Sequence, residues 1–346
     1  MADHQEGTSM SFKIKNFKIQ NLFGTKDLEW NLGDVSVLVG KNGSGKSTIL
    51  DTIKNLLLQE ADRSLHQCGN VEITLSDGTK IKHNQIPLKS SEINEFLKAI
   101  KTIVSEQNQK NKIKDTAKTK LEDELKKFDE IISGINTTEN NKSIRTGFFQ
   151  VETEVTVDSD SDGNRKLNIP FEYISTINMN ANSLNEVKSS DGNKTTILDM
   201  EIKKEISRLN SFSTTNPELY SSVKTRFESA INDLFSEGFK EINISDDLFF
   251  VSTINKNKIR VRDLSSGERQ LVYTLLKASV AAFTDSILLM DEPEISLHLS
   301  WQEKLISKIK YINPNGQIII VTHSPAVVMN GWMTSYVDIK DLEKRS

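Results

Sequence analysis

The stretch Gly40-Lys-Asn-Gly-Ser-Gly-Lys-Ser47 separates two segments with different apolar patterns. Before it, residues 35–39 read Val-Ser-Val-Leu-Val, a short apolar run that is typical of a buried strand. After it, apolar residues recur at 49, 50, 53, 56 and 57, which is the spacing of one helix face. The pattern G-x-x-x-x-G-K-[ST] between a strand and a helix predicts a phosphate-binding loop. The alternative, a glycine-rich turn with a chance lysine, does not account for these flanking elements.

The residue types of this loop suit phosphate chemistry. Gly40, Gly43 and Gly45 are expected to take positive φ, so that successive backbone N–H groups turn toward phosphate oxygens. The helix that follows adds unsatisfied N–H groups and a partial positive charge. Lys46 is expected to contact the β- and γ-phosphates, and the Ser47 hydroxyl is expected to bind Mg²⁺. The predicted nucleotide-binding residues here are Gly40, Lys41, Asn42, Gly43, Ser44, Gly45, Lys46, Ser47 and Thr48.

Composition excludes several classes of protein. The chain has 346 residues, 36% hydrophobic and 27% charged, which describes a globular protein of one large domain or two. No apolar run is long enough to span a membrane, and the polar N-terminus predicts a cytoplasmic protein. The chain has one cysteine, Cys68, and five histidines, so neither a disulfide framework nor a structural zinc site is expected. A net charge of −4 argues against general coating of nucleic acid, although a local basic patch is compatible with it.

Two apolar runs in the second half end in polar residues. Residues 286–290 predict a buried parallel strand, followed by Asp291 and Glu292. Asp291 is expected to hold the Mg²⁺ shell, and Glu292 is the candidate general base for water. Residues 317–322 predict a second such strand, followed by His323, which is expected to contact the γ-phosphate or the attacking water.

The segment Leu264-Ser-Ser-Gly-Glu-Arg-Gln270 precedes an apolar helix and forms a second anion-binding helix start. One chain does not need two such sites for one triphosphate. The second site is therefore expected to serve the nucleotide of a neighbouring subunit.

These motifs together resemble the ATP-binding-cassette (ABC) ATPases, and most closely their SMC, RecF and OLD-like branch. Glu294-Ile-Ser-Leu-His298 and residues 12–22 are also similar to segments of the OLD-like branch. The resemblance covers roughly residues 11–60 and 258–330. It implies an α/β P-loop NTPase of ABC type, with a mixed sheet core, an antiparallel β subdomain and an inserted helical arm.

The resemblance also implies ATP and Mg²⁺ as cofactors and a homodimer that encloses ATP between two subunits. Ser265 and Gly267 would then contact the γ-phosphate of the partner's nucleotide. The segment's predicted nucleotide-binding residues are Ser265, Ser266, Gly267 and Glu268. The sequence departs from the family at the glutamine loop, because no glutamine follows the predicted strand 171–177. Thr176, Asn178 and Gln150 are the possible substitutes.

The middle of the chain reads as insertions into one nucleotide-binding core. We expect a tail over residues 1–10, the first part of the core over 11–90, a helical insertion over 91–146, a β-hairpin and helical subdomain over 147–257, and the rest of the core over 258–346. Asp77-Gly78 predicts a hairpin turn. Seven lysines between 98 and 120 suit a solvated helix face better than a DNA-binding arm. The acidic run 158–163 lacks the glutamate of a calcium loop.

Three functions remain open at this stage. The first is an ATP-hydrolysing dimeric switch in anti-phage defence or DNA-related work. Its effector, a nuclease or toxin, would be separately encoded, because the 23 residues after His323 are too few for the TOPRIM domain of OLD-type nucleases. The second is a slowly hydrolysing scaffold that senses or sequesters a partner. The third is a RecF-like repair ATPase that binds DNA.

Overall fold

The computed structural model describes residues 12–60, 65–86, 152–158, 167–175, 186–188, 194–244 and 248–344. The chain divides into two units, one of residues 1–84 and 155–346 and the other of residues 85–154. The predicted helical insertion over 91–146, the lysines of 98–120 and the three possible glutamine-loop substitutes lie outside the described residues. The description that follows concerns the first unit.

A parallel sheet of five strands carries the core of this unit, in the order β15-β3-β14-β13-β7. Its strands are β3 (Val35–Val39), β7 (Phe171–Ser175), β13 (Ile287–Asp291), β14 (Ile318–Thr322) and β15 (Tyr336–Asp338). All neighbouring pairs are parallel. Every residue of β3, β13 and β14 is buried, as the apolar runs predict for a sheet covered on both faces.

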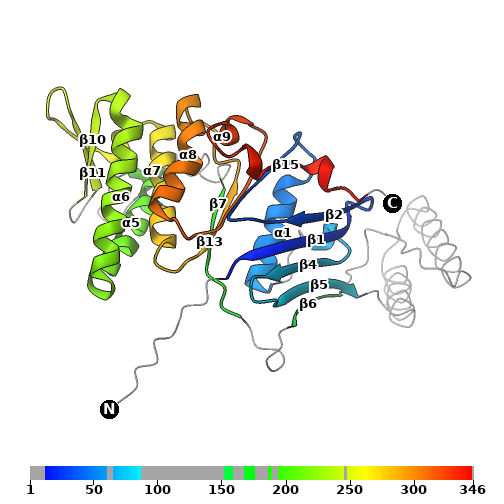
Figure 1. The fold of residues 1–346 in the computed structure, drawn as a ribbon. Coiled ribbons are helices and arrows are strands. Elements are labelled where there is room, and N and C mark those ends of the chain that lie inside the picture. Colours follow the sequence, from blue (N-terminus) through cyan, green and yellow to red (C-terminus); the bar gives the residue numbers. More distant parts are fainter. Residues whose placement is uncertain are drawn as a thin grey trace, which may run out of the picture. The chain divides into compact units, whose positions relative to one another are not determined.

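Alternate residues of the sheet enter two different hydrophobic cores. Val37, Met290 and Ile320 face one core, where they pack with helices α5 to α8. Leu38, Leu289 and Ile319 face the other, where they pack with α1 (Lys46–Leu58) and an antiparallel sheet. Figure 1 shows the two coverings on either side of the parallel strands. Because successive side chains of a strand point to opposite faces, each parallel strand contributes residues to both cores.

The antiparallel sheet has the order β2-β1-β4-β5-β6. Its strands are β1 (Ile14–Leu22), β2 (Lys26–Asn31), β4 (Val71–Leu75), β5 (Lys80–Ile86) and β6 (Glu152–Asp158). The predicted Asp77-Gly78 turn joins β4 to β5, with Gly78 at φ +90°. Gln317, which precedes β14, ties this sheet to the parallel one. Its side chain accepts a hydrogen bond from the Ile14 N–H and donates to the Ile14 and Gly33 carbonyls.

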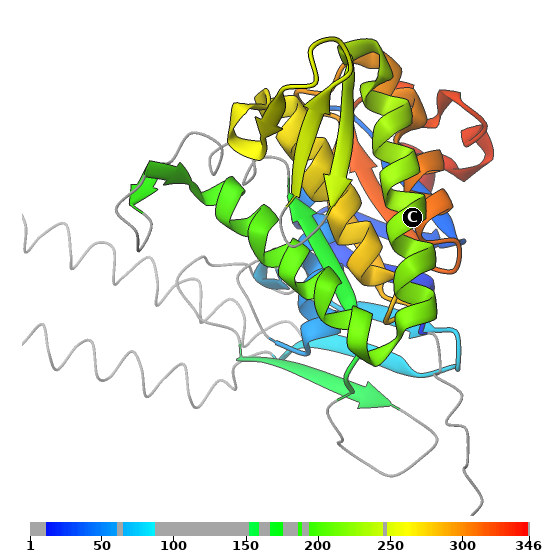
Figure 2. The same ribbon diagram turned by 90° about the vertical axis from the view of Figure 1, so that its left-hand side faces the viewer.

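Four long helices cover the other face of the parallel sheet (Figure 2). They are α5 (Ile197–Thr215), α6 (Pro217–Phe235), α7 (Ser266–Ala281) and α8 (Leu299–Ile312). A capping box at Thr196 and Asp199 begins α5, and Asn216 with Pro217 begins α6. Between α6 and α7 lies a small sheet of β10 (Lys240–Ile244), β11 (Leu248–Ser252) and β12 (Lys258–Arg260).

The remaining elements are short. They are β8 (Glu186–Lys188), β9 (Lys194–Thr196), α9 (Ala326–Met329), and the 3₁₀ turns η1 (Leu65–Gln67), η2 (Ser236–Gly238), η3 (Val261–Asp263), η4 (Met333–Ser335) and η5 (Ile339–Leu342). The parallel sheet and the antiparallel subdomain confirm the predicted mixed α/β fold class, with the inserted arm outside the described residues. Helices α5 and α6 lie within residues 147–257, for which the sequence predicts a β-hairpin and helical subdomain.

Candidate functional site

The carboxyl ends of the parallel strands bring the predicted site residues to one edge of the sheet. The phosphate loop follows β3, Asp291 ends β13, and His323 follows β14. The pairs Asp291↔Val321 and Thr322↔Val39 show that these three strands end at adjacent positions. Ligands of open α/β sheets bind outside this edge.

The glycines of the phosphate loop serve two different purposes. Gly43 and Gly45 have φ of +76° and +102°, as the sequence predicts. Gly40 is not among the positive-φ residues, so that part of the prediction is wrong. A Cβ at Gly40 would lie 2.8 Å from Ile339 Cγ2 and 2.9 Å from Ser44 Oγ, so this glycine is needed for space. At Gly45 a Cβ would also approach Phe23 to 2.9 Å.

Polar groups of the loop point into it. The Lys46 ammonium donates hydrogen bonds to the carbonyls of Gly40 (2.9 Å) and Lys41 (3.2 Å), across the mouth of the loop. The Ser44 hydroxyl is buried without a hydrogen-bond partner in the described structure. Lys41, Asn42 and Gly43 are exposed, whereas Thr48 is half-buried in the first turn of α1. A phosphate group would supply the acceptors that Lys46 and Ser44 require.

The donors next to this loop suit Mg²⁺. The Ser47 hydroxyl donates a hydrogen bond to Asp291 Oδ1 at 3.0 Å, which places both oxygens together. Burial raises the pKa of Asp291, and the neighbouring charges of Glu292 and Asp51 raise it further. The described residues contain no cluster of three His, Cys, Asp or Glu side chains that could hold a metal ion by themselves. Mg²⁺ keeps several waters and binds through one or two carboxylates plus phosphate oxygens, and Ser47 and Asp291 supply oxygen donors of this kind.

Asp51 and Tyr173 extend the site beyond the residues that the sequence suggested. Asp51 lies one helical turn after Ser47, and the Tyr173 hydroxyl donates to its Oδ1 at 3.1 Å. The i, i+4 spacing from Ser47 is the signal that could have revealed Asp51.

Glu292 and His323 lie against each other. His323 Nδ1 is 3.2 Å from Glu292 Oε1 and 3.8 Å from Glu294 Oε1. Glu292 has a φ of +48°, a left-handed conformation that non-glycine residues seldom adopt and that clusters at functional sites. Its N–H donates to the Val321 carbonyl at 2.8 Å, which fixes the turn after β13 to the end of β14. The sequence placed Glu294 in a family motif but gave it no role.

The predicted signature segment begins helix α7. Ser265 is the N-cap, and its hydroxyl accepts from the Glu268 N–H at 3.3 Å, while Glu268 Oε2 accepts from the Ser265 N–H at 2.8 Å. Ser265 and Ser266 are exposed. Gly267 is buried, and a Cβ there would lie 2.4 Å from the Ser296 carbonyl oxygen.

Two observations bear on the predicted role of this segment. Glu268 also pairs with Lys240 at 2.5 Å. Burial tends to raise the pKa of Glu268. The hydrogen bonds from Lys240 and from the Ser265 backbone outweigh burial and hold this pKa below its usual value. Glu268 therefore has protein partners for both carboxylate oxygens. Within the described residues, no hydrogen bond joins this segment to the phosphate loop of the same chain.

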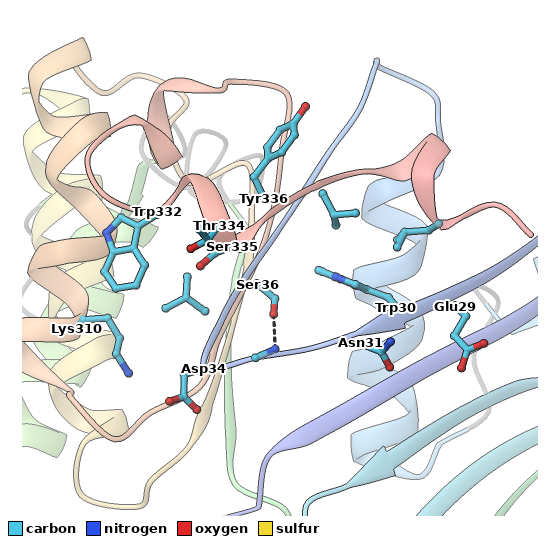
Figure 3. A pocket seen from close by; sticks show the side chains of 14 residues that line it. Glu29, Trp30, Asn31, Asp34, Ser36, Lys310, Trp332, Thr334, Ser335 and Tyr336 are labelled. Carbon is cyan, nitrogen blue, oxygen red and sulfur yellow. Dashed lines mark hydrogen bonds between the residues drawn. The ribbon is translucent and has the colours of Figure 1, made fainter.

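A cavity of this unit lies away from this edge. It has a volume of about 750 Å³ and includes Val35 and Ser36, at the amino end of β3 (Figure 3). Its charged lining is already paired within the chain. Asp34 binds Lys13 at 2.8 Å, and Lys310 donates to the carbonyls of Pro314 and Gly316. Because the phosphate loop follows the carboxyl end of β3, this cavity at the amino end is separate from the phosphate site.

The fold and this site define a P-loop ATPase fold of the ABC type. Its structural neighbours include a crystal structure of an SMC head bound to the C-terminal winged-helix domain of ScpA, with a TM-score of 0.52, 11% identity and 92% of each chain covered. An SMC head from Pyrococcus furiosus, bound to the C-terminal domain of ScpA, matches with a TM-score of 0.50, 10% identity and the same coverage. At such identities the likeness shows the fold alone.

The chain belongs to the family described as "AAA domain, putative AbiEii toxin, Type IV TA system", whose model matches residues 35–330. It is 22% identical to the retron Vc95 probable ATPase of Vibrio cholerae serotype O1 biovar El Tor, over 90% of this chain and 70% of that protein. It is 31% identical to the Septu protein PtuA of Bacillus thuringiensis over 34% of each chain. The retron Ec83 probable ATPase of Escherichia coli matches at 29% identity, over 42% of this chain and 28% of that protein.

A separate finding concerns membranes. In the part of the chain that the structure describes, no helix has the length and apolar character that crossing a bilayer requires.

Proposed function

We propose that this chain hydrolyses ATP and that ATP closes two copies of it into a dimer. The observation that carries the hydrolytic part is the single sheet edge at which the phosphate loop, Asp291, Glu292 and His323 meet. Membership of an AAA-domain family supports the same reading.

Each side chain has a distinct task in this proposal. Lys46 binds the β- and γ-phosphates, together with the backbone N–H groups of residues 41–48. Ser47 and Asp291 hold Mg²⁺, which neutralises charge on the phosphates when bound. Glu292 accepts a proton from the attacking water, and His323 orients that water.

The position of the signature segment supports the proposed dimer. Ser265 and Ser266 are exposed at the start of a 16-residue helix. The Ser265 N–H is bonded to Glu268, so the Ser266 N–H and the two hydroxyl hydrogens are the groups that can donate to an anion from outside the subunit. In the proposed dimer, Ser265, Ser266 and Gly267 contact the γ-phosphate held by the partner's phosphate loop. Glu268 supports them through its contacts with Ser265 and Lys240.

The biological setting is part of the proposal. We place the switch in the bacterial cytoplasm, in anti-phage defence, with a separately encoded nuclease or toxin as effector. The resemblance to the OLD-like branch implies such a role. The relatives named as retron probable ATPases, the Septu relative and the toxin in the family description support it.

The first test measures ATP turnover by the purified chain and by Glu292→Gln. Loss of the general base is expected to slow turnover on the order of 10²–10⁴-fold while ATP binding persists. Lys46→Ala is expected to lose nucleotide binding itself. A wild-type chain that binds ATP without measurable turnover, and that Glu292→Gln leaves unchanged, would support the scaffold function instead.

A second test addresses sharing of the site. Glu292→Gln with ATP is expected to double the molar mass in light scattering, because the closed state persists. A Ser265→Arg subunit mixed with a Lys46→Ala subunit should recover one intact composite site per dimer. Well-folded mixed dimers without any turnover would contradict sharing between subunits.

A further inference from the structure

Two carboxylates, Glu292 and Glu294, approach the same ring nitrogen of His323. The distances from Nδ1 are 3.2 Å to Glu292 Oε1 and 3.8 Å to Glu294 Oε1. The shorter one is within hydrogen-bond range, and the longer one is just outside it. One N–H group makes one good hydrogen bond. Glu292 is therefore the acceptor in this structure, and Glu294 is a second acceptor nearby.

Glu294 is held more tightly than Glu292. Its side chain is 3% exposed, and its Oε1 accepts a short hydrogen bond from the Thr322 hydroxyl. Its backbone carbonyl accepts from the Leu297 N–H at 3.0 Å, and the Gln302 amide lies at 3.4 Å from the same oxygen. Burial raises the pKa of its carboxyl group.

Glu294 also has a vacant acceptor. Its Oε2 is buried and has no hydrogen-bond partner in the described structure. A buried carboxylate oxygen without a donor is costly, so such an atom needs an explanation. His323, on the strand end that also carries Thr322, lies 3.8 Å from the other oxygen of this carboxylate, Oε1.

The present contact conflicts with the proposed role of Glu292. A general base must face the proton it removes, within hydrogen-bond reach. In this structure Glu292 Oε1 instead faces the imidazole of His323. Turning this oxygen to the attacking water releases its bond to His323.

We propose that Glu294 is the positioning residue that takes over the Nδ1–H of His323 when Glu292 turns to the attacking water. The exchange moves a hydrogen bond and no proton. It keeps the proton on Nδ1 and leaves Nε2, on the opposite side of the ring, as an acceptor for a hydrogen of the attacking water. The inference deepens the proposed ATP hydrolysis and rests on it.

The key variant is Glu294→Gln, which keeps the shape of the side chain and removes its charge. It is expected to lower kcat on the order of 10–100-fold, the usual effect of losing an outer partner that orients a histidine. Affinity for a fluorescent ATP analogue is expected to change less than about threefold, because the hydrogen bonds of Glu294 are with Thr322, Leu297 and Gln302. The matched control is Glu205→Gln on α5, whose side chain is 4% exposed and pairs with Arg208 and Lys277. The control is expected to reduce stability and to leave kcat within about twofold.

A second measurement distinguishes positioning from a structural effect. Nitrogen-15 shifts of labelled histidines, with His323→Gln used for assignment, report which ring nitrogen carries the proton. In Glu292→Leu, which has no acceptor at that position, the proton of His323 is expected to stay on Nδ1, held by Glu294. In the double variant Glu292→Leu/Glu294→Leu neither side chain can accept, and the proton is expected to move to Nε2. This readout needs no turnover.

The outcomes separate the two proposals. A wild-type chain without ATP hydrolysis would contradict the proposed function, whatever the state of His323. If the wild type hydrolyses ATP and Glu294→Gln does so at the same rate, the role of Glu294 is refuted. An unchanged tautomer in the double variant would refute it as well, even if Glu294→Gln folds poorly.

Discussion

Replacing Gly267 by alanine would place a methyl carbon 2.4 Å from the carbonyl oxygen of Ser296. An ordinary carbon–oxygen contact is about 3.3 Å, so the two segments must separate by roughly 0.9 Å. Both sides of the contact are backbone, and Ser296 is fixed in a left-handed conformation at φ +67°. No flexible side chain can move aside to make room. We expect Gly267→Ala to lower the free energy of unfolding by about 1–3 kcal/mol, the cost of overpacking a tight contact.

The same displacement would reach the catalytic residues. Ser296 belongs to the turn that starts at Glu292, immediately after β13. A misplacement near 1 Å can cost on the order of 100-fold in rate. We therefore expect turnover to fall by up to that factor in Gly267→Ala, together with the loss of stability.

The assay is urea unfolding without nucleotide, followed by ATP turnover. Measuring stability in the absence of ATP separates packing within one chain from any contact with a partner's phosphate. Gly238→Ala is the matched control, because a Cβ there meets no atom within 4 Å. Its stability should change by less than about 1 kcal/mol. An unfolding midpoint of Gly267→Ala equal to that of wild type would refute the argument from packing.

Other predictions concern the sheets and the metal. Gln317→Leu leaves the Ile14 N–H and the Ile14 and Gly33 carbonyls without their partner, so we expect a loss of about 2–5 kcal/mol in urea unfolding. A hydrogen bond from Lys344 lowers the pKa of Glu29 to about 2, below its usual value of 4.5. The folded state therefore gains stability from Glu29 above pH 4.5 and loses it as pH falls toward 2. The melting temperature of Glu29→Gln should accordingly fall less than that of wild type over this interval. Chelation of Mg²⁺ by EDTA should stop turnover, whereas binding of a fluorescent ATP analogue should remain measurable; turnover that survives EDTA would contradict the metal's role.

The sequence predicts the parts of this molecule that depend on local pattern. The runs before Gly40, Asp291 and His323 are apolar and short, and each is a buried parallel strand. Because parallel strands end at one edge, the meeting of these polar residues follows from the pattern. The N-cap at Ser265 can also be predicted from the sequence, because a serine three positions before a glutamate is the pattern of a capping box.

Other features depend on residues that are distant in the sequence. Position 40 requires a glycine because the side chain of Ile339, which is distant in the sequence, leaves no room for a Cβ. The position of His323 between Glu292 and Glu294 follows from the register of β13 against β14 and from a left-handed turn at Glu292. No periodicity encodes either fact. The sequence also does not distinguish Phe17 and Trp30, which are buried, from Phe23, which is 44% exposed beside the phosphate loop.

The order of strands also governs when the nucleotide site can come into existence during synthesis. Strand β3 pairs with β14 and β15, and its partner Ile318 follows Val35 by 283 residues. At roughly 5–20 residues per second, a ribosome needs about 15 to 60 s to reach that partner. Throughout this interval the strand that carries the phosphate loop has neither neighbour of its sheet. A nascent chain therefore acquires its site for ATP only after β14 has been translated, and until then the apolar strand β3 depends on other protection against aggregation.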